Sequence, residues 1–262
     1  MPFGSVLSEF EEINLETADG VEFKMKNSPF LKLALKTIGI PHIEMRARAR
    51  IILSYFPKEG KNKKLLDAGC GPGIYSLTLK KRGFDVYAID IDKNKIDFLK
   101  KNAKDIRISK ADVTNLLFKD NFFDYIICSE VIEHIKKDKK AIKELIRVLK
   151  PKGILVLTTP KVSVKNVNTY RKWGHFRPGY DGLNFHLMAI EHNLFIQKID
   201  VYSSKIMSKM FEMNEKLYRN KILLGLLFYP LYSIGLFGDL IKYGEFNGIA
   251  VKFEKKWSLD LL

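Results

Sequence analysis

The glycine-rich stretch at residues 67–73, Asp-Ala-Gly-Cys-Gly-Pro-Gly, constrains the fold of this chain more than any other feature. It follows the apolar pair 65–66, and a helical apolar pattern begins after it at Ile74, Leu77 and Leu79. This order predicts a short buried strand, a tight turn and a helix, the repeating unit of parallel α/β sheets. Because glycines adopt positive φ and carry no Cβ, a ligand can approach such a turn closely. Ligands of open α/β sheets bind at the carboxyl ends of strands, so this turn is the expected binding site.

The spacing of the glycines separates two classes of ligand. The dinucleotide fingerprint G-x-G-x-x-G has its last glycine where this chain has Ile74. The match is instead to D-x-G-x-G-x-G, led by Asp67. That pattern resembles the first motif of class I S-adenosylmethionine-dependent methyltransferases. The resemblance runs from about Ile43 to Thr159. It is closest to the broad group that contains the ubiquinone-biosynthesis and related small-molecule methyltransferases.

The next segments of the chain agree with this resemblance. Residues 86–90 read as a second apolar strand that ends in an acid, and 111–113 follow a third strand. Residues 123–129 read as a fourth strand, which leads into 130–135. Alternation of short strands and helices predicts a parallel sheet with helices on both faces. The expected strands lie near 64–68, 84–89, 105–109, 123–128 and 153–159, and the expected helices near 73–82, 93–103 and 138–149.

We therefore expect an α/β fold: a Rossmann-like, seven-stranded, mostly parallel sheet with helices on both faces. A helix at 183–192, a sixth strand at 194–202 and a last strand at 248–253 complete this scheme, and residues 150–153 form a turn before the fifth strand. A helical apolar insertion precedes the last strand. The expected parts are an N-terminal helical cap segment at 1–40, the methyltransferase core at 41–202, the insertion at 203–245, and the last strand with the C-terminus at 246–262.

The resemblance implies that S-adenosylmethionine binds along the strand ends. Asp67 supports the methionine end of the cofactor and the turn, and Asp90 accepts from the ribose hydroxyls. An acid in the position of Asp90 also suits NAD, so this residue alone does not discriminate. Asp112 and Val113 contact the adenine, and the backbone near Ser129 lies along the methionine portion. The full set of cofactor-binding candidates is Asp67, Gly69, Cys70, Gly71, Asp90, Ile91, Asp112, Val113 and Ser129.

His134 is the leading candidate for a general base toward the methyl acceptor, because an imidazole titrates near neutral pH. A packed or helix-capping histidine is the alternative. Glu130, Glu133 and His134 match the Glu-x-x-Glu-His string through which some quinone O-methyltransferases bind a divalent ion. The same string occurs in methyltransferases without a reported metal, so we expect no metal.

The chain carries 45 basic and 30 acidic residues, a formal charge of +15. This excess favours anionic partners without choosing among them, and a solvated basic surface is an equal alternative. Residues 170–180 combine aromatic and basic side chains, which leaves an RNA methyltransferase as the alternative function. Residues 222–238 are free of charge and favour a small or lipid-like acceptor, either as a lid over the substrate or as a membrane contact.

Two cysteines in an α/β chain whose N-terminal residues lack a basic and then apolar pattern indicate a reduced compartment. We expect a cytoplasmic protein with a candidate peripheral contact at the inner face of the membrane. Nucleic acid is a less favoured partner, because the sequence contains no separate RNA-binding module. The acceptor atom and the oligomeric state stay open at this point.

Overall fold

The computed structural model of the protein describes residues 14–16, 22–24, 43–103, 105–163, 167, 170–204 and 246–257. The chain divides into two compact units, Met1–Ile51 with Val201–Gly248, and Ile52–Asp200 with Ile249–Leu262. In the first unit, β1 (Asn14–Glu16) pairs antiparallel with β2 (Glu22–Lys24). The apolar segment 222–238 and the helix expected within residues 1–40 lie outside the described residues.

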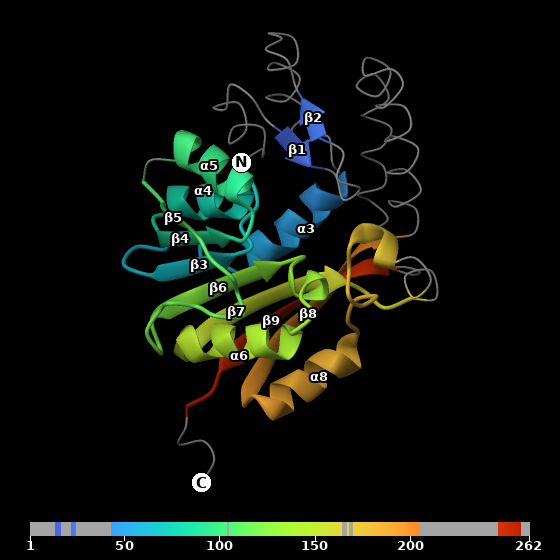
Figure 1. The fold of residues 1–262 in the computed structure, drawn as a ribbon. Helices are drawn as coiled ribbons and strands as arrows, with labels where there is room; N and C mark the ends of the chain where they lie inside the picture. The colour runs from blue at the N-terminus through green and yellow to red at the C-terminus, as the bar shows by residue number, and fades with distance from the viewer. Residues whose placement is uncertain are drawn as a thin grey trace. The chain divides into compact units, whose positions relative to one another are not determined.

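The main sheet has seven strands: β3 (Lys64–Ala68), β4 (Asp85–Asp90), β5 (Arg107–Lys110), β6 (Phe123–Ser129), β7 (Leu149–Pro160), β8 (Leu194–Ser204) and β9 (Phe246–Lys255). Their order is β5-β4-β3-β6-β7-β9-β8 (Figure 1). The pairings from β5 to β7 are parallel. This confirms the expected Rossmann-like, mostly parallel seven-stranded sheet. The strand order reverses at β3, which lies between β4 and β6, so the glycine-rich turn sits at the topological switch point.

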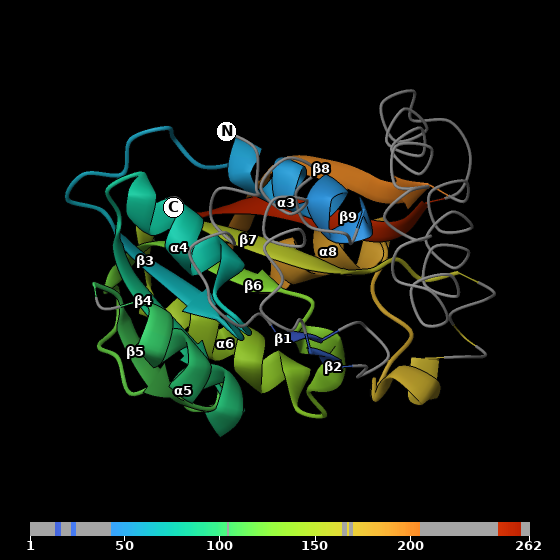
Figure 2. The ribbon, with the colours of Figure 1, turned by 90° about the horizontal axis from the view of Figure 1, so that it is seen from above.

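The helices of the second unit lie on both faces of the sheet, as expected. They are α4 (Ile74–Lys81) and α5 (Lys93–Asn102) on one face, and α6 (Asp138–Val148) and α8 (Gly182–Glu191) on the other (Figures 1 and 2). α3 (Ile43–Ser54) precedes β3. Two short 3₁₀ helices, η1 (Ile132–His134) and η2 (Tyr170–Trp173), follow β6 and β7.

Alternation along the strands sends neighbouring side chains to opposite faces of the sheet. Leu66 and Ile126 belong to one buried cluster that includes Leu145 of α6 and Phe185 of α8. Asp67, one residue after Leu66, points to the other face, where α4 lies, and bonds a side chain of that helix. Within the described part of the chain, no helix has the length and apolar character needed to cross a bilayer.

The turn expected at residues 150–153 lies inside β7 instead of before it. Leu149 pairs with Phe123 and Ile154 pairs with Tyr125, so residues 150–153 bulge out opposite a single residue of β6. Lys152 has a φ of 59°, which reverses the chain within the bulge. The strand therefore begins earlier than 153–159, while the other expected strands and helices of this unit are confirmed with small shifts at their ends.

Candidate active site

The glycine-rich turn is fastened to the end of β4 by backbone hydrogen bonds. The N–H groups of Gly69 and Cys70 donate to the carbonyl of Ile89 at 2.8 and 2.9 Å. The N–H of Gly71 donates to Oδ2 of Asp90 at 2.9 Å, and the N–H of Asp92 donates to Oδ1 of the same carboxylate at 2.9 Å. The Asp90 carboxylate thus fixes the turn after β3 and the start of α5 together, and each of its oxygens keeps a further lone pair for a ligand.

The three glycines of the turn serve different purposes. All have positive φ, 75°, 53° and 87° for Gly69, Gly71 and Gly73. A Cβ at Gly69 would lie 2.3 Å from a methyl of Val131, and one at Gly73 would lie 2.4 Å from a methyl of Leu99. A Cβ at Gly71 would meet nothing within 4 Å. Gly69 and Gly73 are therefore needed for packing, and Gly71 alone opens onto free space that a ligand can use.

Asp67 lies beneath the turn and is almost fully buried, with 1% of its surface exposed. The hydroxyl of Ser76 on α4 donates to its Oδ2 at 2.6 Å. Burial raises the pKa of the Asp67 carboxyl to about 6; the Ser76 hydrogen bond opposes this rise, and the charge of Asp90 adds to it. The acid is thus a structural support of the turn whose charge is costly unless a cation lies nearby.

The tips of β4 and β5 carry the residues predicted to contact the nucleoside. The N–H of Ala111 donates to the carbonyl of Asp90 at 3.0 Å, which joins the two strand ends. Ile91, the residue after β4, is a large apolar side chain that is 65% exposed. Asp112 is exposed, and its Oδ1 accepts from the N–H of Thr114 at 2.8 Å. Val113 is buried in the core, so only its backbone can reach a ligand.

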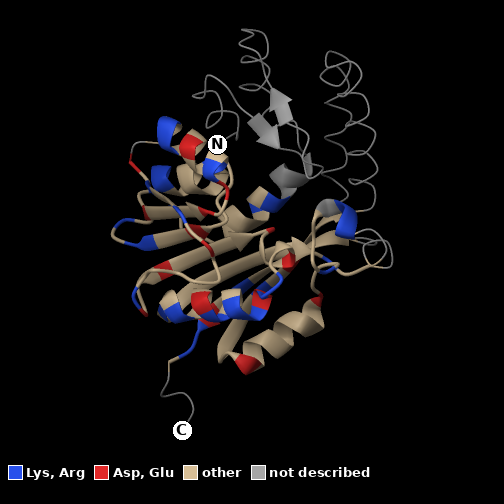
Figure 3. Ribbon diagram, in the orientation of Figure 1, with Lys and Arg blue, Asp and Glu red and all other residues tan. Residues whose placement is uncertain are grey.

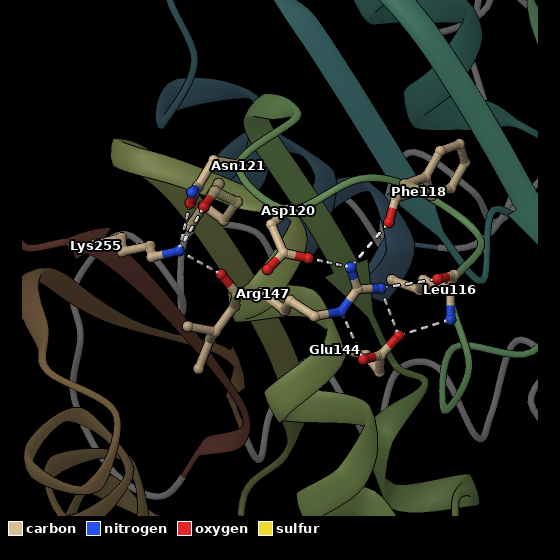
Figure 4. Close-up of polar contacts among 9 residues, drawn as sticks. Leu116, Phe118, Asp120, Asn121, Glu144, Arg147 and Lys255 are labelled. Atoms are coloured by element: carbon tan, nitrogen blue, oxygen red, sulfur yellow. Dashed lines mark hydrogen bonds and ion pairs between the residues drawn. The ribbon is translucent and has the colours of Figure 1, made fainter.

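The long connection from β5 to β6 is held by Arg147 of α6 (Figure 4). Its guanidinium donates to the carbonyls of Leu116 and Phe118 at 2.8 and 2.9 Å and forms ion pairs with Asp120 and Glu144. The bonds to Glu144 and Asp120 raise the pKa of Arg147. Arg147 therefore belongs to a structural network that fixes the loop beginning at residues 112–113.

Polar side chains at the ends of β6 and β7 form a chain of hydrogen bonds. Ser129 Oγ lies 2.9 Å from Oγ1 of Thr158, and the Thr158 hydroxyl donates to Oε1 of Glu130 at 3.1 Å. Because a hydroxyl has one proton, Ser129 must donate to Thr158 when Thr158 donates to Glu130. The Ser129 oxygen then remains an acceptor, which suits a ligand that presents N–H or O–H groups.

His134 lies in η1, directly after β6, and is paired with a second histidine. Its ring meets the His175 ring edge to face with centroids 4.4 Å apart, and its Nδ1 lies 3.4 Å from the carbonyl of Gly174. A carbonyl can only accept, so this contact leaves Nε2 of His134 as the unprotonated nitrogen. Burial lowers the pKa of His134, and burial together with His134 lowers the pKa of His175 to about 4. Both rings are therefore neutral at neutral pH.

The loop that carries His175 is fixed by contacts with η1. The N–H of Phe176 donates to the carbonyl of Glu133 at 2.9 Å. Arg177 forms an ion pair with Asp138 and donates to the carbonyl of Ile135 at 2.9 Å. Residues 170–180 stand out in the sequence for their aromatic and basic side chains, but His175 was not among the predicted site residues. The Gly174–Arg177 segment, with its histidine and arginine two residues apart, was the available signal.

One group of three side chains in the described part of the chain brings potential metal ligands close together. Ligand atoms of Glu133, His134 and His175 lie within 4.8 Å of one another. This group takes His175 in place of Glu130, which the sequence string included. The expectation of no metal stays a prediction.

The thiols of Cys70 and Cys128 are both buried and unbridged, and burial raises the pKa of each.

Comparison with known proteins bears on the identity of this unit. Residues 66–157 match the family described as "Methyltransferase domain". Residues 66–157 are therefore similar to methyltransferase domains. A similar curated protein is the ubiquinone biosynthesis O-methyltransferase of Rickettsia typhi, 37% identical over 101 residues that cover 37% of this chain and 40% of that protein. The counterpart from Rickettsia akari is 32% identical over 111 residues, 41% of this chain and 44% of its own. The chain thus covers less than half of the length of these relatives.

Solved structures of low sequence identity share the fold of this chain. Geranyl diphosphate C-methyltransferase from Streptomyces coelicolor, in complex with Mg²⁺, geranyl-S-thiolodiphosphate and S-adenosyl-L-homocysteine, superposes with a TM-score of 0.61 at 15% identity. The match covers 79% of this chain and 75% of that one. Phosphoethanolamine N-methyltransferase 2 of Haemonchus contortus, in complex with S-adenosyl-L-methionine, has a TM-score of 0.60 at 15% identity, over 90% of this chain and 63% of that one.

The different environments of two turn glycines predict different effects of the same substitution. Gly71→Ala should cost about 1–2 kcal/mol of unfolding free energy from its positive φ alone. Gly69→Ala should cost about 1–3 kcal/mol more, because its Cβ meets Val131. Urea denaturation of both variants tests this difference. Equal losses, or a larger loss for Gly71→Ala, would contradict the packing argument.

The raised pKa of Asp67 predicts a pH-dependent stability difference. Since the folded state holds this proton more tightly than the unfolded state, the carboxyl destabilises the fold increasingly as pH rises from about 4 to about 6. Asp67→Asn should therefore be more stable than wild type above pH 6, by about 2–3 kcal/mol. The difference should shrink as pH falls toward 4. Thermal or urea unfolding at several pH values measures it, and a difference independent of pH would count against the buried acid.

Proposed function

We propose that the protein transfers a methyl group from S-adenosylmethionine to a small-molecule or lipid-like acceptor. The observation that carries this proposal is the open space at Gly71 beside the Asp90 carboxylate, at the switch point of a methyltransferase-type sheet. The names of the Rickettsia relatives support a small-molecule acceptor. The comparisons give no support to the RNA alternative.

The residues at the strand ends fit the parts of the cofactor. S-adenosylmethionine brings a methyl group already activated on a sulfonium, so the protein must bind it, align it and exclude water. The free lone pairs of Asp90 suit the ribose hydroxyls, and the exposed face of Ile91 suits the adenine ring. Asp112 would accept from the adenine amine, with Val113 contributing backbone only. The Ser129 oxygen and the Asp67 carboxylate suit the positively charged methionine end.

His134 is the proposed base toward the acceptor. Its Nε2 is unprotonated when Nδ1 donates to Gly174, and burial keeps the ring neutral at neutral pH. A neutral imidazole can take a proton from a hydroxyl acceptor as the methyl group arrives. His175, packed against it, restricts the ring orientation. The remainder of the rate enhancement comes from proximity and alignment of the two substrates.

The cellular location and the remaining partners are also part of this proposal. The free, buried thiols of Cys70 and Cys128 suit a reducing compartment, and we propose a cytoplasmic protein on this ground. A contact of residues 222–238 with the inner face of the membrane remains part of the proposal for a lipid-like acceptor. A binding assay with RNA at rising salt tests the alternative function, since phosphate contacts weaken steeply with salt.

Cofactor binding is tested by calorimetry with S-adenosylmethionine and S-adenosylhomocysteine. Asp90→Asn should weaken binding at least about tenfold, because the ribose loses a charged acceptor. Ile91→Ala should weaken it several-fold without affecting folding, because its side chain is largely exposed. The control Asp97→Asn removes an exposed acid of α5 and should bind as wild type does. A folded wild-type protein that binds neither compound would overturn the proposal.

The role of His134 is tested with radiolabelled S-adenosylmethionine and a panel of phenolic, carboxylic and amine acceptors. His134→Gln should lower kcat about 10²–10⁴-fold on the active acceptor, with cofactor affinity unchanged. In the wild type, the rate should rise with pH through a pKa below the ordinary histidine value. His186→Gln, an exposed histidine of α8, is the matched control. An unchanged kcat, or the same loss in the control, would exclude His134 as the base.

A further inference from the structure

Helix α8 is apolar on two opposite faces. Phe185, Met188 and Ala189 are buried in the core against the sheet. On the opposite side, Leu183, Leu187 and Ile190 are 66%, 55% and 79% exposed. Their spacing of four and three residues places them in one line along the helix. We call these three side chains the α8 stripe. A surface helix of a soluble domain normally carries polar residues on such a face, so the α8 stripe marks a contact surface.

Helix α6, on the same face of the sheet, presents a row of lysines. Its inward side chains Ala141, Ile142 and Leu145 belong to the same core as the inward side chains of α8. Exposed lysines lie on its outward side and at its start, and we call four of them the α6 lysines: Lys136, Lys139, Lys140 and Lys143. Figure 3 shows blue segments along the ribbon of this helix. Among the described residues, none of the four forms an ion pair.

The two features belong to one surface. α6 and α8 pack on the same face of the sheet and share a core, so their outward sides face the same way (Figure 1). Burial lowers the pKa of His192, which follows α8 directly, and the charges of Lys143 and Lys139 lower it further. These two α6 lysines therefore lie within electrostatic range of the end of α8.

We propose that this surface docks on an anionic lipid bilayer. Proteins that bind a membrane surface insert apolar side chains at the boundary between headgroups and acyl chains. Basic side chains beside them contact the anionic headgroups. The α8 stripe and the α6 lysines supply these two kinds of side chain. The formal charge of +15 acts in the same direction. The surface differs from residues 222–238, on which the earlier membrane expectation depended.

Two other occupants fit the surface less well. Nucleic acid would engage the α6 lysines but would leave the aliphatic α8 stripe exposed to water. A second copy of the chain, paired through the same face about a twofold axis, would bring the two sets of α6 lysines toward each other, which is unfavourable. A bilayer satisfies both the stripe and the lysines.

The position of this surface suits the function proposed above. This part of the inference rests on that proposed function, because docking helps the reaction only if the acceptor is lipid-like. α6 begins at Asp138, three residues after η1, and Asp138 pairs with Arg177 of the loop beside His134. α8 begins shortly after that loop. The surface therefore begins at the edge of the sheet that holds the candidate active site, and docking would bring a lipid-like acceptor to this edge.

Vesicle co-sedimentation of the full-length protein tests the proposal. Phosphatidylcholine vesicles that contain about 30% phosphatidylglycerol should bind the wild type, and pure phosphatidylcholine vesicles should bind it far less. Leu187→Ser with Ile190→Ser, and separately Lys139→Gln with Lys143→Gln, should each weaken binding at least about tenfold. All four positions are exposed, so circular dichroism should show unchanged folding.

Matched controls change the same residue types elsewhere. Leu117→Ser alters a leucine that is 91% exposed outside α8, and Lys100→Gln with Lys101→Gln alters two exposed lysines of α5, on the other face of the sheet. Both controls should bind vesicles as the wild type does. Calorimetry with S-adenosylmethionine on the same preparations separates a failure of docking from a failure of the proposed function.

Three outcomes would overturn the proposal. One is wild-type protein that does not bind the anionic vesicles, and another is binding that both double variants retain. The third is a wild type that elutes as a dimer in size-exclusion chromatography while the stripe variant elutes as a monomer. That result would make the surface an interface between copies of the chain.

Discussion

The hydrogen bond from the Gly71 N–H to the Asp90 carboxylate is the contact on which the candidate site depends. It joins the turn after β3 to the tip of β4 across the switch point of the sheet. The same carboxylate accepts from Asp92 and so fixes the start of α5. Because both oxygens are held by backbone donors, the carboxylate is preorganised, and a ligand that uses its remaining lone pairs meets a rigid acceptor.

Asp90 and Asp67, the two acids of the candidate site, differ in their surroundings and in their roles. Asp90 lies at the strand tip, where backbone donors satisfy it, whereas Asp67 lies beneath the turn with Ser76 as its partner. The pKa of Asp67 is raised to about 6 by burial. A cationic ligand above the turn would favour the charged form of Asp67, so binding and the protonation of this acid are linked.

The strand ends could be predicted from sequence because their signals are local. Glycine spacing, an acid after an apolar run and short alternating elements each act within a few residues, and they located Asp67, Gly71 and Asp90. The role of Gly69 could not be read in this way, since its missing Cβ makes room for Val131, far along the chain. The structure likewise places the Val113 side chain in the core instead of at the surface.

The contact between His134 and His175 could not be predicted from local sequence patterns. His134 and His175 are 41 positions apart, and the tertiary contacts of Arg177 with Asp138 and Ile135 bring them together. Residue types at positions 170–180 indicated a functional loop but not its partner. The apolar outer face of α8 was equally hidden, because its pattern in sequence is that of an ordinary buried helix.

A crystal structure with S-adenosylhomocysteine would show whether the nucleoside binds at the Asp90 carboxylate. We predict ribose hydroxyls within hydrogen-bond distance of this carboxylate and ligand atoms in van der Waals contact with Gly71. A ligand bound away from the β3–β4 strand ends, or no ligand beside a well-ordered turn at saturating concentration, would contradict it.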